Sequence, residues 1–297
     1  SALLGADWDS DRGCWAPFYE SLLASPVEFT NEEQQLGMQG LVSHEQLNHP
    51  KGRKRLERLV HAVLRANPSL TRMDGLGALA APLAALYSDN EPAAFLCLQH
   101  ILHGFLWSFY SEDSSTKRRQ CTHLFAALLR FADPQLELHL QSIGMQPDMY
   151  ASVWFSTWFA NLLPLSQLLL LWDSILLRPP QFPLFIGVCI MHFFRRTLLS
   201  LDEVSHVSSF FASCAQLIDV AVLAQASLAF FQAVPASVTL PLYPRHSAGD
   251  ALLSGPDSGR ITAIDPDWSV GAQDLEMSER DAHEAAARQP LVQRAME

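Results

Sequence analysis

The sequence lacks the features of a disulfide-stabilised or metal-stapled protein. Its 297 residues include only five cysteines, an odd number, and no two of them have C-x-x-C spacing. A chain of this length buries enough apolar surface to fold without such cross-links. The scattered cysteines therefore indicate free, mostly buried thiols in a reducing compartment. They are Cys14, Cys97, Cys121, Cys189 and Cys214.

Positive charge is also scarce. The formal net charge is −11, with 20 lysines and arginines against 31 aspartates and glutamates. A nucleic-acid-binding protein needs a basic surface facing phosphate, so we predict no nucleic-acid partner. The sequence contains none of the motifs G-x-x-x-x-G-K-[ST], G-x-G-x-x-G, G-x-S-x-G and H-E-x-x-H. We therefore predict no cofactor and no nucleotide site belonging to the chain itself.

Charged residues are absent between Met149 and Trp172, a run long enough to span a bilayer. Pro164 divides this run into two pieces that are each too short to span. The later apolar run from Pro183 to Phe194 is shorter still and ends at two arginines. Such runs are typical of buried core helices, so we predict that the protein is not transmembrane. The chain begins without Met and without a signal peptide, which suggests an excerpt of a longer protein.

Apolar residues recur with the period of an α-helix through most of the chain. A stripe within residues 56–64 predicts one helix, which Asn67-Pro68 ends. Asp133-Pro134 predicts a capping residue and first position for a helix that stops at Gly144. Further helices are expected over residues 147–162, 165–177, 183–200, 203–214 and 216–232. No segment of comparable length alternates with period two, so we predict an all-α fold.

The pattern changes after residue 235, where prolines and glycines interrupt every helical period. Residues 245–297 hold 10 acidic and 5 basic side chains, a disproportionate share of the negative charge. We predict that residues 1–235 form one helical domain, truncated at its N-terminus. Residues 236–297 are predicted to be a linker or disordered tail with a short helix near 279–288.

One stretch of the chain, residues 133–159, resembles the central motif of TBC domains. In that family the pattern D-P-x-L…H-L…G…P…Y-A…W-F-x-T-x-F precedes a Pro-containing turn and a helix that ends in Trp-Asp. The matching positions are Asp133, Pro134, Leu136, His139, Leu140, Gly144, Pro147, Tyr150, Ala151, Trp154, Phe155, Thr157 and Phe159, continued by Pro164 and by Trp172-Asp173. The large aromatic residues in this motif are expected to form the core and to contact no ligand.

Within that family, the chain most resembles the TBC domain of TBC-domain-containing kinase-like proteins. Residues 50–83 carry the additional likeness, which covers roughly residues 1–235. The resemblance implies a right-handed multi-helix domain that binds a Rab-type small GTPase in membrane trafficking. It also implies a cytoplasmic protein that reaches endomembranes through its partner. Such a domain regulates GTPase activation and is not itself an enzyme.

The resemblance also locates two catalytic positions, and both are substituted here. TBC domains supply an Arg from I-x-x-D-x-x-R, which neutralises charge on the transferring phosphoryl group, and a Gln from Y-x-Q-G, which orients the attacking water. The Arg position aligns with Gln39, or with Val42 if a short gap is allowed. The Gln position aligns with Asp74. We therefore predict a catalytically degenerate GTPase-activating module.

Neighbouring residues offer alternatives. Arg72 is a candidate substitute for the missing arginine, which would make the domain an active Rab GTPase activator. The predicted partner-binding residues are Arg53, Arg55, Met73 and Gly75. Five basic residues lie within the eight positions 51–58, where they could contact an acidic GTPase surface, anionic lipid heads, or only solvent. A third alternative is an architectural domain of a larger kinase-like multidomain protein.

The segment 97–103 carries three candidate metal ligands. Cys97, His100 and His103 recur every three residues and would share one side of a helix. No fourth ligand is evident, and the surrounding residues are apolar. We interpret the three as packing residues and predict no metal.

Overall fold

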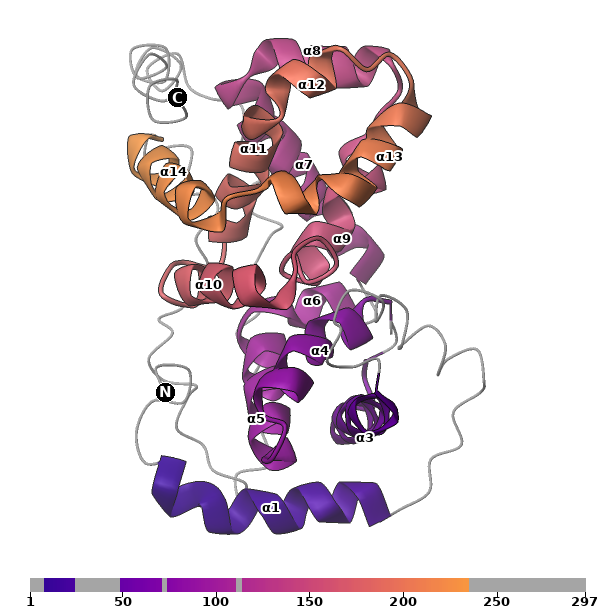
Figure 1. Cartoon of the computed structure of the whole chain (residues 1–297), viewed down its shortest axis with the longest axis vertical. Coiled ribbons are helices and arrows are strands. Elements are labelled where there is room, and N and C mark those ends of the chain that lie inside the picture. The colour runs from indigo at the N-terminus through magenta and orange to yellow at the C-terminus, as the bar shows by residue number, and fades with distance from the viewer. Residues whose placement is uncertain (1–7, 25–48, 71–73, 111–113, 235–297) are drawn as a thin grey trace. The chain divides into compact units, whose positions relative to one another are not determined.

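The computed structural model describes residues 8–24, 49–70, 74–110 and 114–234, and the predicted tail and its short helix lie outside them. Within these ranges every regular element is a helix, which confirms the predicted all-α fold (Figure 1). The described residues divide into two compact units, with the boundary at Ser114.

The first unit contains α1 (Trp8–Ala24), α3 (Pro50–Ala66), α4 (Leu76–Leu86), α5 (Glu91–Ile101), the π-helix η4 (Leu102–Leu106) and α6 (Trp107–Tyr110). Three of these helices, α3, α4 and α5, pack against one another. Helix α4 is the interior element, because every residue from Leu76 to Ala84 is buried. The predicted helix over 56–64 is confirmed: α3 begins with Pro50 at its first turn and ends at the C-cap Asn67.

The second unit holds the remaining helices. These are α7 (Ser114–Ala132), α8 (Pro134–Ser142), the 3-10 helix η5 (Pro147–Met149), α9 (Ala151–Ser156), α10 (Leu165–Leu176), α11 (Phe182–Phe193), α12 (Arg195–Leu199), α13 (Val204–Ser213), the 3-10 helix η6 (Cys214–Leu217) and α14 (Val220–Ala233). The predicted caps of α8 are confirmed. Asp133 accepts a hydrogen bond from the amide of Leu136 at 3.0 Å, and Gly144 has φ +82° just beyond the helix end.

The predicted helix over 147–162 is wrong. It is divided into η5 and α9, and α9 ends at Ser156 because Trp158 and Phe159 adopt left-handed φ values of 47° and 64°. The amide of Phe159 donates to the carbonyl of Trp154 at 2.8 Å, the bond of a Schellman ending that usually needs glycine. The Trp158 carbonyl accepts from Nε1 of Trp172 at 2.9 Å, and its ring is buried. Burial of these aromatic rings offsets the backbone strain.

The predicted helix over 183–200 is also wrong, because it breaks at Phe194 into α11 and α12. Arg195 therefore begins a new helix, where its Nε donates to Oδ2 of Asp133 at 2.5 Å. His139 of α8 lies with its Nε2 3.1 Å and 2.9 Å from the carbonyl oxygens of Leu198 and Leu201. These contacts bind α12 to α8 and overcome the local preference for one continuous helix.

Close packing in the second unit depends on a glycine in α11. A Cβ atom at Gly187 would lie 3.0 Å from the ring of Phe125 and 3.1 Å from the ring of Phe155. The hydrogen side chain lets α11 approach these rings, which lie 5.3 Å apart in a T-shaped pair.

Among the described helices, none alone combines the length and the apolar composition needed to cross a membrane. Only the pair Val204–Leu217 and Val220–Ala233, bent by 108°, meets that test, by length and composition.

Candidate functional site

The candidate site lies in the first unit, where the chain passes from α3 into α4. Helix α4 begins after Gly75, whose backbone is left-handed with φ +85° and ψ −8°. A residue with a Cβ atom is strained in this conformation, so the turn requires glycine. Asp74 is half-buried immediately before this turn. An acidic residue is favourable there, since the positive end of the α4 dipole is adjacent.

A buried polar network fixes the other end of this connection, at Asn67. The Asn67 side-chain Nδ2 donates to the carbonyl of Val63 at 2.7 Å and to Oε1 of Gln99 at 2.8 Å. Its Oδ1 lies 2.8 Å from Nε2 of His103, which is therefore the donor. The network binds the end of α3 to α5 and to η4, so the segment leaving α3 starts from a fixed point.

His103 is held neutral in this network. Burial and the neighbouring His100 lower its pKa to about 4. Its ring stacks on Trp107, with centroids 4.5 Å apart and planes at 17°. It lies within the π-helix, a local irregularity that is often found at functional sites.

The three candidate metal ligands Cys97, His100 and His103 have separate hydrogen-bond partners. Nδ1 of His100 lies 3.0 Å from the carbonyl of Leu96, and Sγ of Cys97 lies 3.6 Å from the hydroxyl of Tyr87. Burial raises the pKa of the Cys97 thiol. In the described part of the chain, no group of three or more His, Cys, Asp or Glu residues could hold a metal ion.

Apart from the polar network at Asn67, a charged cluster around Glu91 binds α1 and α3 to the start of α5. The Glu91 carboxylate accepts from the hydroxyl of Tyr19 at 2.9 Å and from Nε of Arg58 at 3.0 Å. A further bond joins Arg58 Nη2 to Oε1 of Glu91. Nε of Arg55 lies 3.9 Å from the same carboxylate, and its side chain is only 24% exposed. This cluster stabilises the packing of the first unit.

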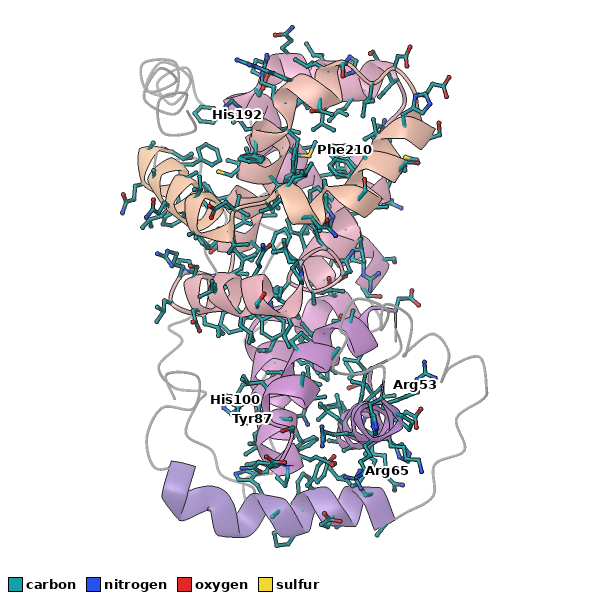
Figure 2. All side chains as sticks on the ribbon, viewed as in Figure 1. Arg53, Arg65, Tyr87, His100, His192 and Phe210 are labelled. Atoms are coloured by element: carbon teal, nitrogen blue, oxygen red, sulfur yellow. The ribbon has the colours of Figure 1, made fainter. Side chains whose placement is uncertain are left out.

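Of the residues predicted for the site, the structure describes four: Asp74, Gly75, Arg53 and Arg55. Asp74 and Gly75 lie together at the start of α4, whereas Gln39, Val42, Arg72 and Met73 are outside the described residues. Arg53 extends from α3 into solvent (Figure 2). Nε of Arg55 lies 3.9 Å from Oε1 of Glu91 and its side chain is partly exposed, so Arg55 is less exposed than Arg53.

Sequence reasoning did not identify Glu91, Gln99 or His103 as members of these clusters. Asn90-Glu91-Pro92 does carry a helix-start signal: Asn90 accepts from the Ala93 amide at 3.2 Å, and Glu91 lies in the first turn. That signal places a carboxylate at a helix N-terminus. It carries no information about Arg58, which lies 33 residues earlier.

Comparison with known proteins gives a consistent result. Residues 34–199 match the family model described as the Rab-GTPase-TBC domain. The human TBC domain-containing protein kinase-like protein is 35% identical over 156 residues, which are 52% of this chain and 18% of that protein. Its Dictyostelium discoideum counterpart is 31% identical over 166 residues, 56% of this chain and 16% of that protein. The chain therefore spans less than a fifth of these relatives. The matches confirm the resemblance to kinase-like TBC proteins.

Solved structures agree on the fold. The crystal structure of the Chlamydomonas flagellar RabGAP TBC domain superposes with a TM-score of 0.61 over 73% of each chain. At 18% identity this likeness concerns the arrangement of helices alone.

Proposed function

This chain belongs to the Rab-GTPase-TBC domain family, and from that premise we propose that it binds a Rab-type small GTPase without accelerating GTP hydrolysis. Family membership supports a Rab-related function in membrane trafficking. The nucleotide belongs to the partner in this proposal. The chain acts in the cytoplasm and reaches endomembranes through that partner.

The observation that carries the proposal is the pair Asp74 and Gly75 at the start of α4. By resemblance, this is where the family presents its catalytic glutamine. The glycine of the family's motif is present as Gly75, with a left-handed φ of +85°. The side-chain amide of the family's glutamine is replaced here by the carboxylate of Asp74. An amide can both donate to and accept from a water molecule, whereas a carboxylate only accepts. Its negative charge also opposes the γ-phosphate of GTP.

The missing arginine supports the same conclusion. Neither Gln39 nor Val42 carries a guanidinium group, and no lysine or arginine occurs between Arg12 and Lys51. A trans-acting arginine contributes about 10³–10⁵ to the rate in GTPases, because it neutralises charge that develops during phosphoryl transfer. Without it, binding of the partner no longer stabilises the transition state.

One comparison favours a second candidate, an architectural domain. The matched region is 18% or less of the kinase-like relatives, so in those proteins a domain of this kind is one part of a much larger chain. A domain in such a position can join its neighbours without binding a GTPase. The two candidates differ in whether any Rab-type GTPase binds.

The binding test uses a panel of Rab proteins loaded with a non-hydrolysable GTP analogue or with GDP. We expect at least one to bind more tightly in its GTP form. In that complex, Asp74→Asn should strengthen binding about tenfold, since it removes a charge repulsion on the order of 1–4 kcal/mol at 4 Å. The dissociation constant is measured by calorimetry.

Asp89→Asn is the matched control for this substitution. Asp89 is exposed in the first unit, between α4 and α5, and its substitution makes the same change in net charge. It should leave the GTP-form affinity unchanged. Equal strengthening by both variants would contradict a specific role for Asp74. No binding by any Rab would favour the architectural candidate.

A further inference from the structure

Positive charge in the first unit is concentrated on one helix. Helix α3 holds six of the chain's 20 lysines and arginines and one acidic residue, Glu57. Every lysine or arginine side chain that the structure describes before Ser114 belongs to α3. The chain as a whole has a net charge of −11, so this helix opposes the overall charge.

The six cations of α3 do not serve one purpose. Arg55 and Arg58 face Glu91, and Arg65 lies in the last turn, where a cation suits the helix dipole. Lys51, Arg53 and Lys54 are exposed in the first turns. Within the described residues, none of these three side chains forms an ion pair or a side-chain hydrogen bond.

The position of these three cations at the start of α3 does not stabilise the helix. They lie at the positive end of the α3 dipole, which contains no acidic residue in its first turn. Lys51 also has a like charge three positions away at Lys54 and four positions away at Arg55, an unfavourable spacing on a helix. A local arrangement that opposes helix stability and has no compensating contact is typical of a functional surface.

We propose that Lys51, Arg53 and Lys54 form a docking surface for an anionic phospholipid membrane. We name these three residues the α3 cation surface. Charge complementarity favours an anionic occupant, and the absence of an apolar anchor favours lipid over protein. None of the exposed large apolar side chains of the described residues is on α3, whereas protein interfaces rely on buried aromatic or apolar anchors and are depleted in lysine.

The rest of the molecule determines how this surface would act. Outside α3, every Asp, Glu, Lys or Arg side chain that the structure describes in the first unit is acidic, so attraction to anionic lipid within this unit is confined to α3. Three cations give a weak, reversible and salt-sensitive attachment. This contact orients the chain on a membrane and does not depend on whether the domain binds a GTPase.

Vesicle sedimentation of the full 297-residue chain tests this proposal. Vesicles of phosphatidylcholine are compared with vesicles that also contain phosphatidylserine. The chain should bind only the anionic vesicles and should be released at about 1 M salt, where the Debye length falls to about 3 Å. The double substitution Lys51→Glu/Lys54→Glu should weaken partition by about 30-fold, because each lost cation contributes about fivefold.

The matched control is Arg119→Glu/Arg196→Glu, which changes net charge equally with two exposed arginines of the second unit. It should retain most vesicle binding. The α3 variant should melt at or above the wild-type temperature, since glutamate suits a helix N-terminus. A wild-type chain without preference for anionic vesicles overturns the proposal, as do equal losses in both variants. Weaker GTPase binding in vesicle-free solution, with unchanged vesicle binding, would assign the surface to a protein instead.

Discussion

Restoring both missing side chains, Gln39→Arg together with Asp74→Gln, is expected to accelerate GTP hydrolysis by a bound Rab-type GTPase by about 10³-fold or more. The arginine supplies most of this gain, because it neutralises charge on the transferring phosphoryl group. The glutamine adds the orientation of the attacking water. The measurement is single-turnover phosphate release, with the activating chain in excess over the GTPase.

Two variants make this prediction specific. The combination of Gln39→Lys with Asp74→Gln introduces the same charge without the planar, five-donor guanidinium, so it should give a much smaller gain. Val42→Arg with Asp74→Gln tests the other alignment of the arginine motif. If neither arginine variant accelerates hydrolysis in a complex that still forms, the assignment of these two positions is wrong.

Loss of Asp133 should produce the largest destabilisation among the capping residues. Its carboxylate is 6% exposed, caps α8 through the Leu136 amide, and pairs with Arg195, which is 31% exposed. Asp133→Ala removes a helix cap, typically about 1 kcal/mol, and leaves a partly buried guanidinium without its anion. We expect a total loss of about 3 kcal/mol in the free energy of unfolding, measured by urea denaturation.

Asp219→Ala provides the matched control. Asp219 caps α14 by accepting from the amides of Ala221 and Val222 at 2.9 Å and 3.2 Å, but it is exposed. Its loss should cost about 1 kcal/mol, as for an ordinary cap. Equal losses in the two variants would show that the Asp133–Arg195 pair adds nothing to stability.

The contribution of Asp133 should also depend on pH. Burial raises its pKa, but the neighbouring His192 and the hydrogen bonds from the Leu136 amide and from Arg195 outweigh burial, so the pKa lies below its usual value. A lowered folded-state pKa stabilises the protein above the unfolded value of about 3.9, and that stability is lost as pH falls through the folded value. The difference between wild type and Asp133→Ala should therefore be complete at neutral pH and shrink below about pH 4.

Local signals in the sequence predicted most helix boundaries correctly. Asn67-Pro68 marks the end of α3, and Asp133-Pro134 with Gly144 marks both ends of α8, because these residues act on backbone groups within a few positions. The helical period of apolar residues predicted the fold class for the same reason. Such features do not depend on distant parts of the chain.

The errors arise where distant residues decide the structure. The end of α9 depends on Trp172, whose ring donates to the carbonyl of Trp158, 14 residues earlier. The break between α11 and α12 depends on Asp133, 62 residues before Arg195. Helix propensity is a property of single residues and cannot predict either of these long-range hydrogen bonds. Tertiary packing overrides it at both places.

The candidate site shows the same division. Gly75 was identified by resemblance, and its left-handed φ accounts for the glycine physically. For Arg55, a predicted partner-binding residue, the sequence gives no sign of its contact with Glu91, 36 positions later, and its role toward a partner stays a prediction. The role of His103 in holding Asn67 was also missed, because a histidine on an apolar helix gives no sign of which distant amide it will meet.

The most direct test of the proposed function is phosphate release from a GTP-loaded Rab that binds the wild-type chain. The chain is added in saturating amount, so that binding is complete and only chemistry is measured. We predict complex formation with hydrolysis at the GTPase's own intrinsic rate. Accelerated phosphate release would contradict the degenerate assignment, and loss of that acceleration in Arg72→Ala would identify Arg72 as the substitute.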